Sequence, residues 1–211
     1  MKEDITIIDN YSRLMLGDHQ DILAISKDES LQDIDRQVKV IAILTGRTED
    51  EILNLPIDTY KTLAARSRFL EQPMPEMARI AKSYIVGPYK LVPVTDFRKI
   101  TTAQYIDFQT FHEAGMEDHF VEILSCLLVP SGKKYNQDYD IIDVQKAIRE
   151  EMSVADGASL YAFFLTSSAG SIKDMLTYSR QEAMRLKDKT RREEILTKIA
   201  AAEALLTNGA G

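Results

Sequence analysis

The fold of this chain is decided by IAILTGRTEDEILNLPIDTYKTLAARSRFL, residues 41–70, which predicts short helices joined by tight turns. Gly46 follows an apolar helical pattern, at a place where a left-handed residue commonly ends a helix. Thr48 then opens a Ser/Thr-x-x-Glu capping box, in which a hydroxyl and a carboxylate satisfy unpaired backbone donors of the next helix. Pro56 and Asp58 indicate a third helix start. We therefore expect a compact helical module in which Thr48 is structural and is not a nucleophile.

Weaker patterns extend this module toward the amino terminus. Residues 31–42 and residues 14–25 carry apolar side chains at helical spacing, so each range predicts a helix. Residues 4–9 alternate weakly between apolar and polar side chains, which predicts a short strand. The amino-terminal region is therefore expected to be helical apart from this strand.

Proline and glycine residues change the character of the chain in its middle. Short β-rich pieces at residues 83–86 and 90–94 flank Gly87 and Pro88. This arrangement predicts a small β-hairpin with a Gly-Pro turn.

The second half of the chain again has helical periodicity. Thr101 and Gln104 form a second capping-box pattern, which opens a helix. A buried helix is expected to follow and to be stopped by Pro130 and Gly132. Periodic apolar residues predict these further helical segments: residues 117–128, 141–152, 153–168 and 171–207. The last segment is expected to be one long helix or a helical hairpin.

Together these patterns predict a mainly α protein, a helical bundle-like body with a small β-hairpin element and a long C-terminal helix or helical hairpin. The expected regions are an acidic helical region at residues 1–72, a Pro/Gly-rich β element at residues 73–98 and a helical region at residues 99–211. They can also form a single domain, because no Ser/Pro/Gly-rich linker separates them.

Charge is distributed unevenly along the chain. Of its 211 residues 45% are hydrophobic and 28% charged, as is usual for a protein that buries a core. The formal net charge is −7, and the acidic excess lies in residues 1–60, which hold thirteen acids against six bases. An acidic face repels nucleic acid and suits a basic protein partner, although solubility is the commoner reason for one.

The chain has a single cysteine, Cys126, which lies in an apolar run. An intrachain disulfide is excluded, and a cytosolic or virion-internal location is expected. Apolar neighbours raise the pKa of a thiol, so we interpret Cys126 as a buried core residue and not as a nucleophile. The sequence suggests neither a signal peptide nor a membrane-spanning stretch.

Two histidines offer the nearest approach to a metal site. His112 and His119 stand seven residues apart, and Gly115 is expected to separate them onto two helices. The acids around them are Glu113, Glu117, Asp118 and Glu122. The HExxH and His-x-x-x-His spacings of zinc sites are absent, so we expect surface histidines, no metal and no cofactor. His19, near two aspartates, is expected at an ordinary polar helix start.

Two loops match reactive motifs only in part. Residues 130–134, PSGKK, contain the Gly-Lys pair of a phosphate loop, but the upstream glycine is missing and no strand is expected before them. Residues 167–171 lack the Gly-x-Ser-x-Gly pattern of a hydrolase elbow. We therefore expect that the protein is not an enzyme, an expectation that a pocket gathering His112, His119 and Glu122 would reverse.

The C-terminal part carries two features that suit a binding partner. Residues 185–192 hold the most concentrated positive charge, which leaves nucleic-acid contact open, although basic helix turns are usually solvated. The predicted C-terminal helices also carry apolar side chains, which fit a core and a subunit interface equally well. These candidate interface residues are Phe163, Phe164, Ile172, Met175, Leu176, Ile195, Leu196 and Ile199.

An ordered set of signatures resembles a family of viral proteins. In chain order they are Asp18-His19-Gln20-Asp21, LTGRTEDEILNLP at residues 44–56, Phe69-Leu70, KITTAQYIDFQTF at residues 99–111, LLVP at residues 127–130 and Phe163-Phe164. This order resembles small proteins encoded in the structural gene blocks of tailed bacteriophages of Bacteroides-like hosts, including crAss-like phages. The resemblance covers most of residues 14–170 and includes no catalytic motif.

The resemblance implies a virion structural protein, a ring or adaptor component of the neck or tail that assembles as a cyclic oligomer. The partners it implies are further copies of the chain and neighbouring neck, tail or portal proteins, with no membrane and with the genome at most passing through the lumen. The protein would lie in the virion, and in the host cytoplasm during assembly. One alternative is a tail assembly chaperone that binds the tape-measure protein, which suits the acidic amino-terminal region. The other is a nucleic-acid-binding phage protein.

Overall fold

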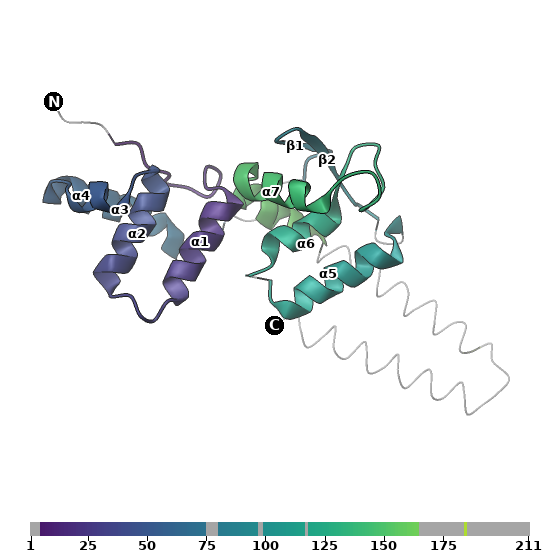
Figure 1. Cartoon of the computed structure of the whole chain (residues 1–211), viewed down its shortest axis with the longest axis horizontal. Helices are drawn as coiled ribbons and strands as arrows, with labels where there is room; N and C mark the ends of the chain where they lie inside the picture. Colours follow the sequence, from purple (N-terminus) through teal and green to yellow (C-terminus); the bar gives the residue numbers. More distant parts are fainter. Residues whose placement is uncertain (1–4, 75–79, 97–98, 117, 165–183, 185–211) are drawn as a thin grey trace. The chain divides into compact units, whose positions relative to one another are not determined.

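The computed structural model describes residues 5–74, 80–96, 99–116, 118–164 and 184. Within these residues the protein is mainly helical with one small antiparallel sheet, which confirms the predicted fold class (Figure 1). The chain divides into two compact units, Met1–Val94 with Thr101–Tyr161, and Thr95–Ile100 with Ala162–Gly211. Apart from Met184, the predicted C-terminal helix or hairpin lies outside the described residues.

The amino-terminal helices follow the turn chemistry of the sequence. They are α1 (Leu16–Lys27), α2 (Asp33–Thr45), α3 (Glu49–Leu53) and α4 (Ile57–Ser67), and the 3-10 turn η1 (Arg68–Glu71) continues α4. Gly46 ends α2 with a φ of 64°, a conformation that favours glycine. Thr48 and Glu51 form the predicted capping box of α3, with both reciprocal hydrogen bonds present. The predictions for these turns are confirmed.

The short strand predicted at residues 4–9 is wrong for residues 5–9, which form no strand. The Ile8 amide instead donates to the Leu44 carbonyl oxygen at 2.9 Å. That carbonyl lies in the last turn of α2, where it has no partner within the helix. Ile7 is fully buried. The segment therefore alternates because it packs on the end of a helix, not because it pairs with a strand.

The sheet contains the predicted hairpin. β1 (Tyr84–Val86) pairs with β2 (Tyr89–Pro93) antiparallel through a turn at Gly87 and Pro88, in which Gly87 has a φ of 54°. The described strands have the order β1-β2-β3.

The third strand, β3 (Leu128–Pro130), corrects the prediction that the preceding helix runs to Leu128 and is stopped by proline. Leu128 pairs with Pro93 and Val129 with Val92, and the Val94 amide donates to the Leu127 carbonyl oxygen at 2.9 Å. Proline has no amide hydrogen to give to a ladder, so it is tolerated at the end of such a strand. The chain leaves the helix because β2 supplies partners for its backbone.

The first unit also contains α5 (Thr102–Ala114), α6 (Phe120–Leu127) and α7 (Ile141–Glu151). Residues 154–164 are helical as well, and the last three of them belong to the second unit. Thr101 caps α5 in the predicted box, and Asp140 accepts a hydrogen bond from the Ile142 amide at the start of α7. Helix α6 supplies much of the core. Its buried residues are Phe120, Val121, Ile123, Leu124, Ser125, Cys126 and Leu127.

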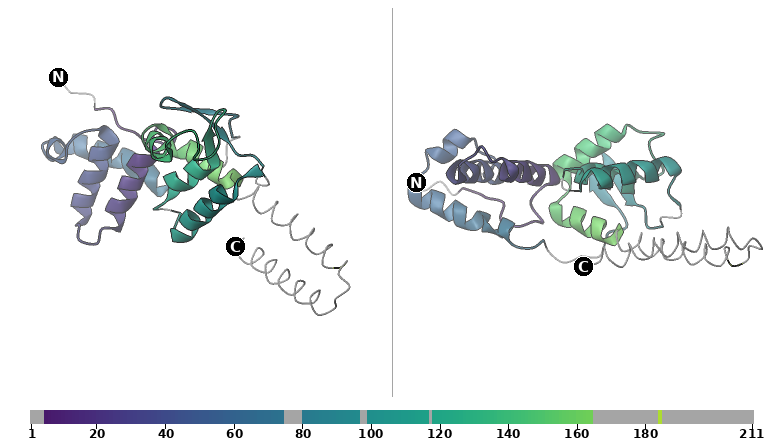
Figure 2. Two further views of the ribbon diagram at one scale, coloured as in Figure 1. Left: turned by 45° about the vertical axis from the view of Figure 1, so that its right-hand side comes forward. Right: turned by 90° about the horizontal axis from the view of Figure 1, so that it is seen from below.

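Backbone hydrogen bonds join the start of α1 to the end of α7, which lie beside each other in Figure 2. The Leu16 amide donates to the Met152 carbonyl oxygen at 2.9 Å, and the Val154 amide donates to the Leu14 carbonyl oxygen at 2.8 Å. A Cβ atom added at Gly17 would lie 2.9 Å from the Arg149 carbonyl oxygen. The close approach of the two helices therefore requires glycine at this position.

Candidate functional site

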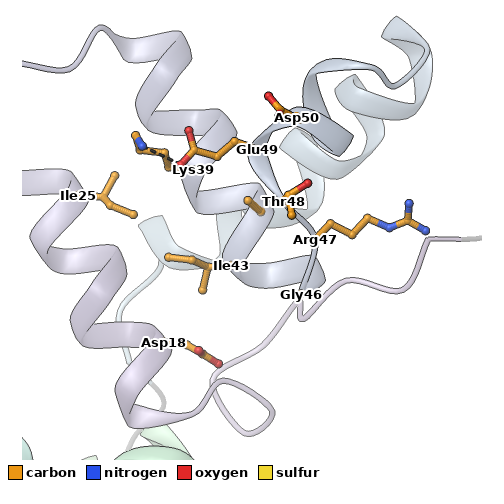
Figure 3. Close-up of a pocket in the computed structure, with 10 residues that line it drawn as sticks. Asp18, Ile25, Lys39, Ile43, Gly46, Arg47, Thr48, Glu49 and Asp50 are labelled. Atoms are coloured by element: carbon orange, nitrogen blue, oxygen red, sulfur yellow. Dashed lines mark hydrogen bonds and ion pairs between the residues drawn. The ribbon is translucent and has the colours of Figure 1, made fainter.

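An open groove of about 790 Å³ lies between α1 and the α2–α3 turn (Figure 3). Its apolar lining includes Ile25 and Ile43, and its polar lining includes Asp18, Lys39 and Arg47. The Gly46 turn places α3 beside α2, and the Lys39 ammonium pairs with the Glu49 carboxylate at 2.7 Å. The other lining residues are Ala42, Gly46, Thr48, Glu49 and Asp50.

The electrostatics of the groove come from ordinary surface groups and one half-buried acid. Burial raises the pKa of Asp18, the nearby Asp21 carboxylate adds to this effect, and Arg149 opposes it. Hydrogen bonds from the Thr48 amide and hydroxyl lower the pKa of the Glu51 carboxyl. The residues that line the groove include no cysteine, serine or histidine.

A second feature of the same module is an exposed apolar surface with acids around it. Ile34 is 53% exposed, Leu53 65% and Ile57 63%. The Tyr60 hydroxyl donates to the Gln37 side-chain oxygen at 2.7 Å, which joins α4 to α2. Ile57 and Ile34 each precede a residue of this pair by three positions, so each lies on the same helix face one turn earlier. We call Ile34, Leu53 and Ile57, together with Asp35, Asp50 and Asp58, the acidic surface.

The structure places His112 and His119 against different aromatic rings. The His112 ring lies 5.8 Å from Phe108 and 6.5 Å from Tyr161, whereas the His119 ring lies 5.7 Å from Phe111. In the part of the chain that the structure describes, no three His, Cys, Asp or Glu side chains are grouped to hold a metal ion.

His19 differs from its prediction. It is 8% exposed in the first turn of α1, and its ring meets Tyr11 edge-on at 6.3 Å. The sequence suggested a polar helix start because two aspartates flank it, but the helix turns this imidazole toward the core. His19 therefore contributes to packing.

Residues 130–134 differ from their prediction in one respect, because strand β3 precedes the Gly-Lys pair. Gly132 has a φ of 77°, and the Lys133 amide donates to the Pro130 carbonyl oxygen at 3.0 Å. This is a tight turn after a strand. The glycine upstream and the hydroxyl after the lysine are still missing, so the phosphate-loop pattern stays incomplete.

Cys126 is fully buried, as predicted, and burial raises the pKa of its thiol to about 11. Its sulfur lies 3.4 Å from the Tyr135 hydroxyl, which donates to the Asp107 carboxylate at 2.9 Å. This chain of polar groups could not be predicted from local sequence, because its members come from α5, α6 and the loop before α7. Burial also raises the pKa of Tyr135, so both groups stay protonated at neutral pH.

Two of the predicted interface residues are described. The rings of Phe163 and Phe164 meet edge-on, 5.6 Å apart. The other six lie outside the described residues, as do the loop at residues 167–171 and the basic segment at residues 185–192. The interface therefore stays a prediction.

None of the described helices is both long and apolar enough to cross a membrane. A scan against protein-family models, a search of curated proteins and a search of solved structures found no match to this chain.

Proposed function

We propose that this chain is a structural subunit of a tailed-bacteriophage virion, a ring or adaptor component of the neck or tail that assembles as a cyclic oligomer. The resemblance of residues 14–170 to phage structural proteins supplies the class of particle. Self-association is supported by one observation, the large aliphatic side chains that the described surface leaves in solvent. They are Ile34, Leu53, Ile57, Ile85, Ile106 and Ile142, each more than half exposed.

Such side chains favour association because covering them releases ordered water, which raises the entropy of the solvent and lowers the free energy of the system. Burying one aliphatic side chain is worth about 1.5–3 kcal/mol. A single exposed isoleucine is common on a monomer, but the acidic surface presents three aliphatic residues on one module. A few such contacts, repeated around a ring, supply the energy of assembly.

The proposed mechanism is mechanical. Each copy contributes short capped helices to a repeated contact, and a contact between two different surfaces closes into a ring when the rotation allows it. Phe163 and the later residues of the candidate interface would add to this contact, whereas Phe164 is only 1% exposed and is part of the core. The acids of the amino-terminal region that lie outside this contact face the next ring or the lumen, where negative charge repels a passing genome.

The test is the mass of the purified full chain by light scattering, followed by negative-stain imaging of each peak. We expect closed rings with a mass that is a whole multiple of 23.9 kDa. A monomer at every concentration up to the solubility limit contradicts the proposal. If that monomer forms a defined complex with a phage tape-measure protein, the chaperone role replaces the ring role.

A further inference from the structure

We propose that the ring contact is head-to-tail, with the acidic surface of one copy covering a basic face of the sheet on the next copy. This inference rests on the proposed function, since it names the two surfaces through which the chain assembles. We define the basic sheet face as Ile85, Lys90, Val92, Lys133 and Lys134.

The sheet register builds an exposed apolar strip on this face. Ile85 pairs with Lys90 across the hairpin, and Val92 lies two residues further along β2, so all three side chains point to the same side. Ile85 is 74% exposed and Val92 37%, whereas Leu91, on the opposite side of β2, is fully buried. The strip is therefore the outer side of the sheet.

Lys90 lies within the strip and two further lysines follow β3, while the hairpin turn carries one acid, because the Gly87 amide donates to the Glu151 carboxylate at 2.9 Å. The Ser131 amide donates to the Lys90 carbonyl oxygen at 2.8 Å, which holds the turn of Lys133 and Lys134 beside the end of the sheet. All three lysines are exposed. Among the described residues, none of their ammonium groups forms an ion pair, so each one is available to a partner.

The acidic surface has the matching properties. Asp33 pairs with Arg36 and Glu49 with Lys39. The carboxylates of Asp35, Asp50 and Asp58, by contrast, form no ion pair with any residue that the structure describes. Lys61 is an exposed cation of the same helix as Asp58, so the surface is predominantly, not uniformly, negative.

Charge decides which contact the two faces can make. If the acidic surface met a second acidic surface across a two-fold axis, like charges would be juxtaposed, and the same holds for the basic sheet face. The acidic surface against the basic sheet face places three free carboxylates near three free ammonium groups, and aliphatic side chains meet between them. Because the two surfaces differ, their contact is heterologous and can close into a ring.

The test uses charge reversal in the full chain. One variant carries Asp50→Lys and Asp58→Lys, and the other carries Lys133→Glu and Lys134→Glu. Sedimentation velocity over a concentration series should show self-association at least tenfold weaker for each variant alone. Circular dichroism establishes that both remain folded. A matched control, Glu113→Lys with Glu150→Lys, reverses two exposed acids outside the acidic surface and should assemble like the wild type.

Restoration of assembly provides the sharper outcome. An equimolar mixture of the two variants should assemble in alternation, and a chain with all four reversals should assemble by itself, because each restores opposite charges at every contact. A folding defect cannot produce this result. If the wild type forms rings and the reversals leave them intact, the head-to-tail contact is wrong and the proposed function stands. If the wild type is monomeric at all concentrations, both are wrong.

Discussion

At the scale of single residues, the polar core of the first unit explains why Cys126 is not a reactive group. Its thiol touches the Tyr135 hydroxyl, which in turn donates to Asp107. Burial disfavours the thiolate most, and the hydrogen bond between Cys126 and Tyr135 only partly offsets this effect. The apolar run around Cys126 was sufficient to predict its burial, but the partners could not be predicted, since they lie 19 residues before it and 9 after it in sequence.

The first prediction concerns the reactivity of this thiol. At pH 8, Cys126 should react with a thiol-specific disulfide reagent about 100-fold more slowly in the native protein than in urea, because its pKa lies near 11 instead of 9. The reaction is followed by absorbance. A variant carrying Ser131→Cys, an exposed position, should release one equivalent rapidly. Equal rates for Cys126 in the native and unfolded protein would contradict its burial.

The same thiol predicts the direction in which the stability of the protein changes with pH. Its pKa is higher in the folded than in the unfolded protein, so its contribution to stability is complete below pH 9 and is lost as the pH rises toward 11. Urea unfolding of the wild type should therefore show a loss of stability across this window that Cys126→Ala reduces. An equal loss in both proteins would show that other groups cause it.

Gly17 provides a prediction about packing. An alanine usually stabilises a helix relative to glycine. At Gly17, however, the new Cβ atom would lie 2.9 Å from the Arg149 carbonyl oxygen, a backbone atom that cannot swing aside. Gly17→Ala should therefore lower the free energy of unfolding by about 1–3 kcal/mol in urea denaturation. An increase in stability would show that α1 and α7 do not approach this closely.

At the scale of elements, the local signals were reliable and the long-range ones were not. The capping boxes at Thr48 and Thr101 and the glycine that ends α2 depend on neighbours within a few residues, and all are present. Strand β3 depends on pairing with β2, which lies more than thirty residues earlier in the chain. Residues 5–9 depend on the end of α2 in the same way. No local pattern encodes such partners.

The capping box of α3 gives a prediction for an element. Thr48→Ala should lower the free energy of unfolding by about 1 kcal/mol at pH 7, because the Glu51 amide loses its acceptor, while Thr48→Ser should have little effect. Hydrogen bonds lower the pKa of Glu51 in the folded protein, so its contribution is present above the unfolded carboxyl pKa and is lost as the pH falls through the folded one. The cost of Thr48→Ala in urea should therefore shrink at pH 3. An equal cost at both pH values would contradict the reciprocal box.

At the scale of the whole molecule, composition predicted an acidic amino-terminal region but not which acids are free to bind a partner. Arg36 and Lys39 neutralise Asp33 and Glu49 through contacts that depend on the helix arrangement. The aliphatic residues of the acidic surface also occupy positions that a helical pattern would assign to a core. Their exposure is a tertiary property, so neither half of the proposed contact could be found in the sequence.

Salt should weaken assembly through such a contact. Exposed charges are screened over about 8 Å at physiological ionic strength and over about 3 Å at 1 M salt. We therefore expect the concentration for half-maximal assembly, measured by sedimentation, to rise at least tenfold between 0.05 and 1 M sodium chloride, on the order expected for several screened pairs. Assembly that is insensitive to salt or strengthened by it would assign the contact to apolar surface alone.

The central claim, that this chain is a self-assembling structural subunit, is tested most directly by native mass spectrometry of the full chain at low ionic strength. The predicted result is one closed stoichiometry, a single multiple of the 23.9 kDa subunit that does not grow with concentration. A spectrum that contains only the 23.9 kDa monomer, at the highest concentration that stays in solution, would contradict it.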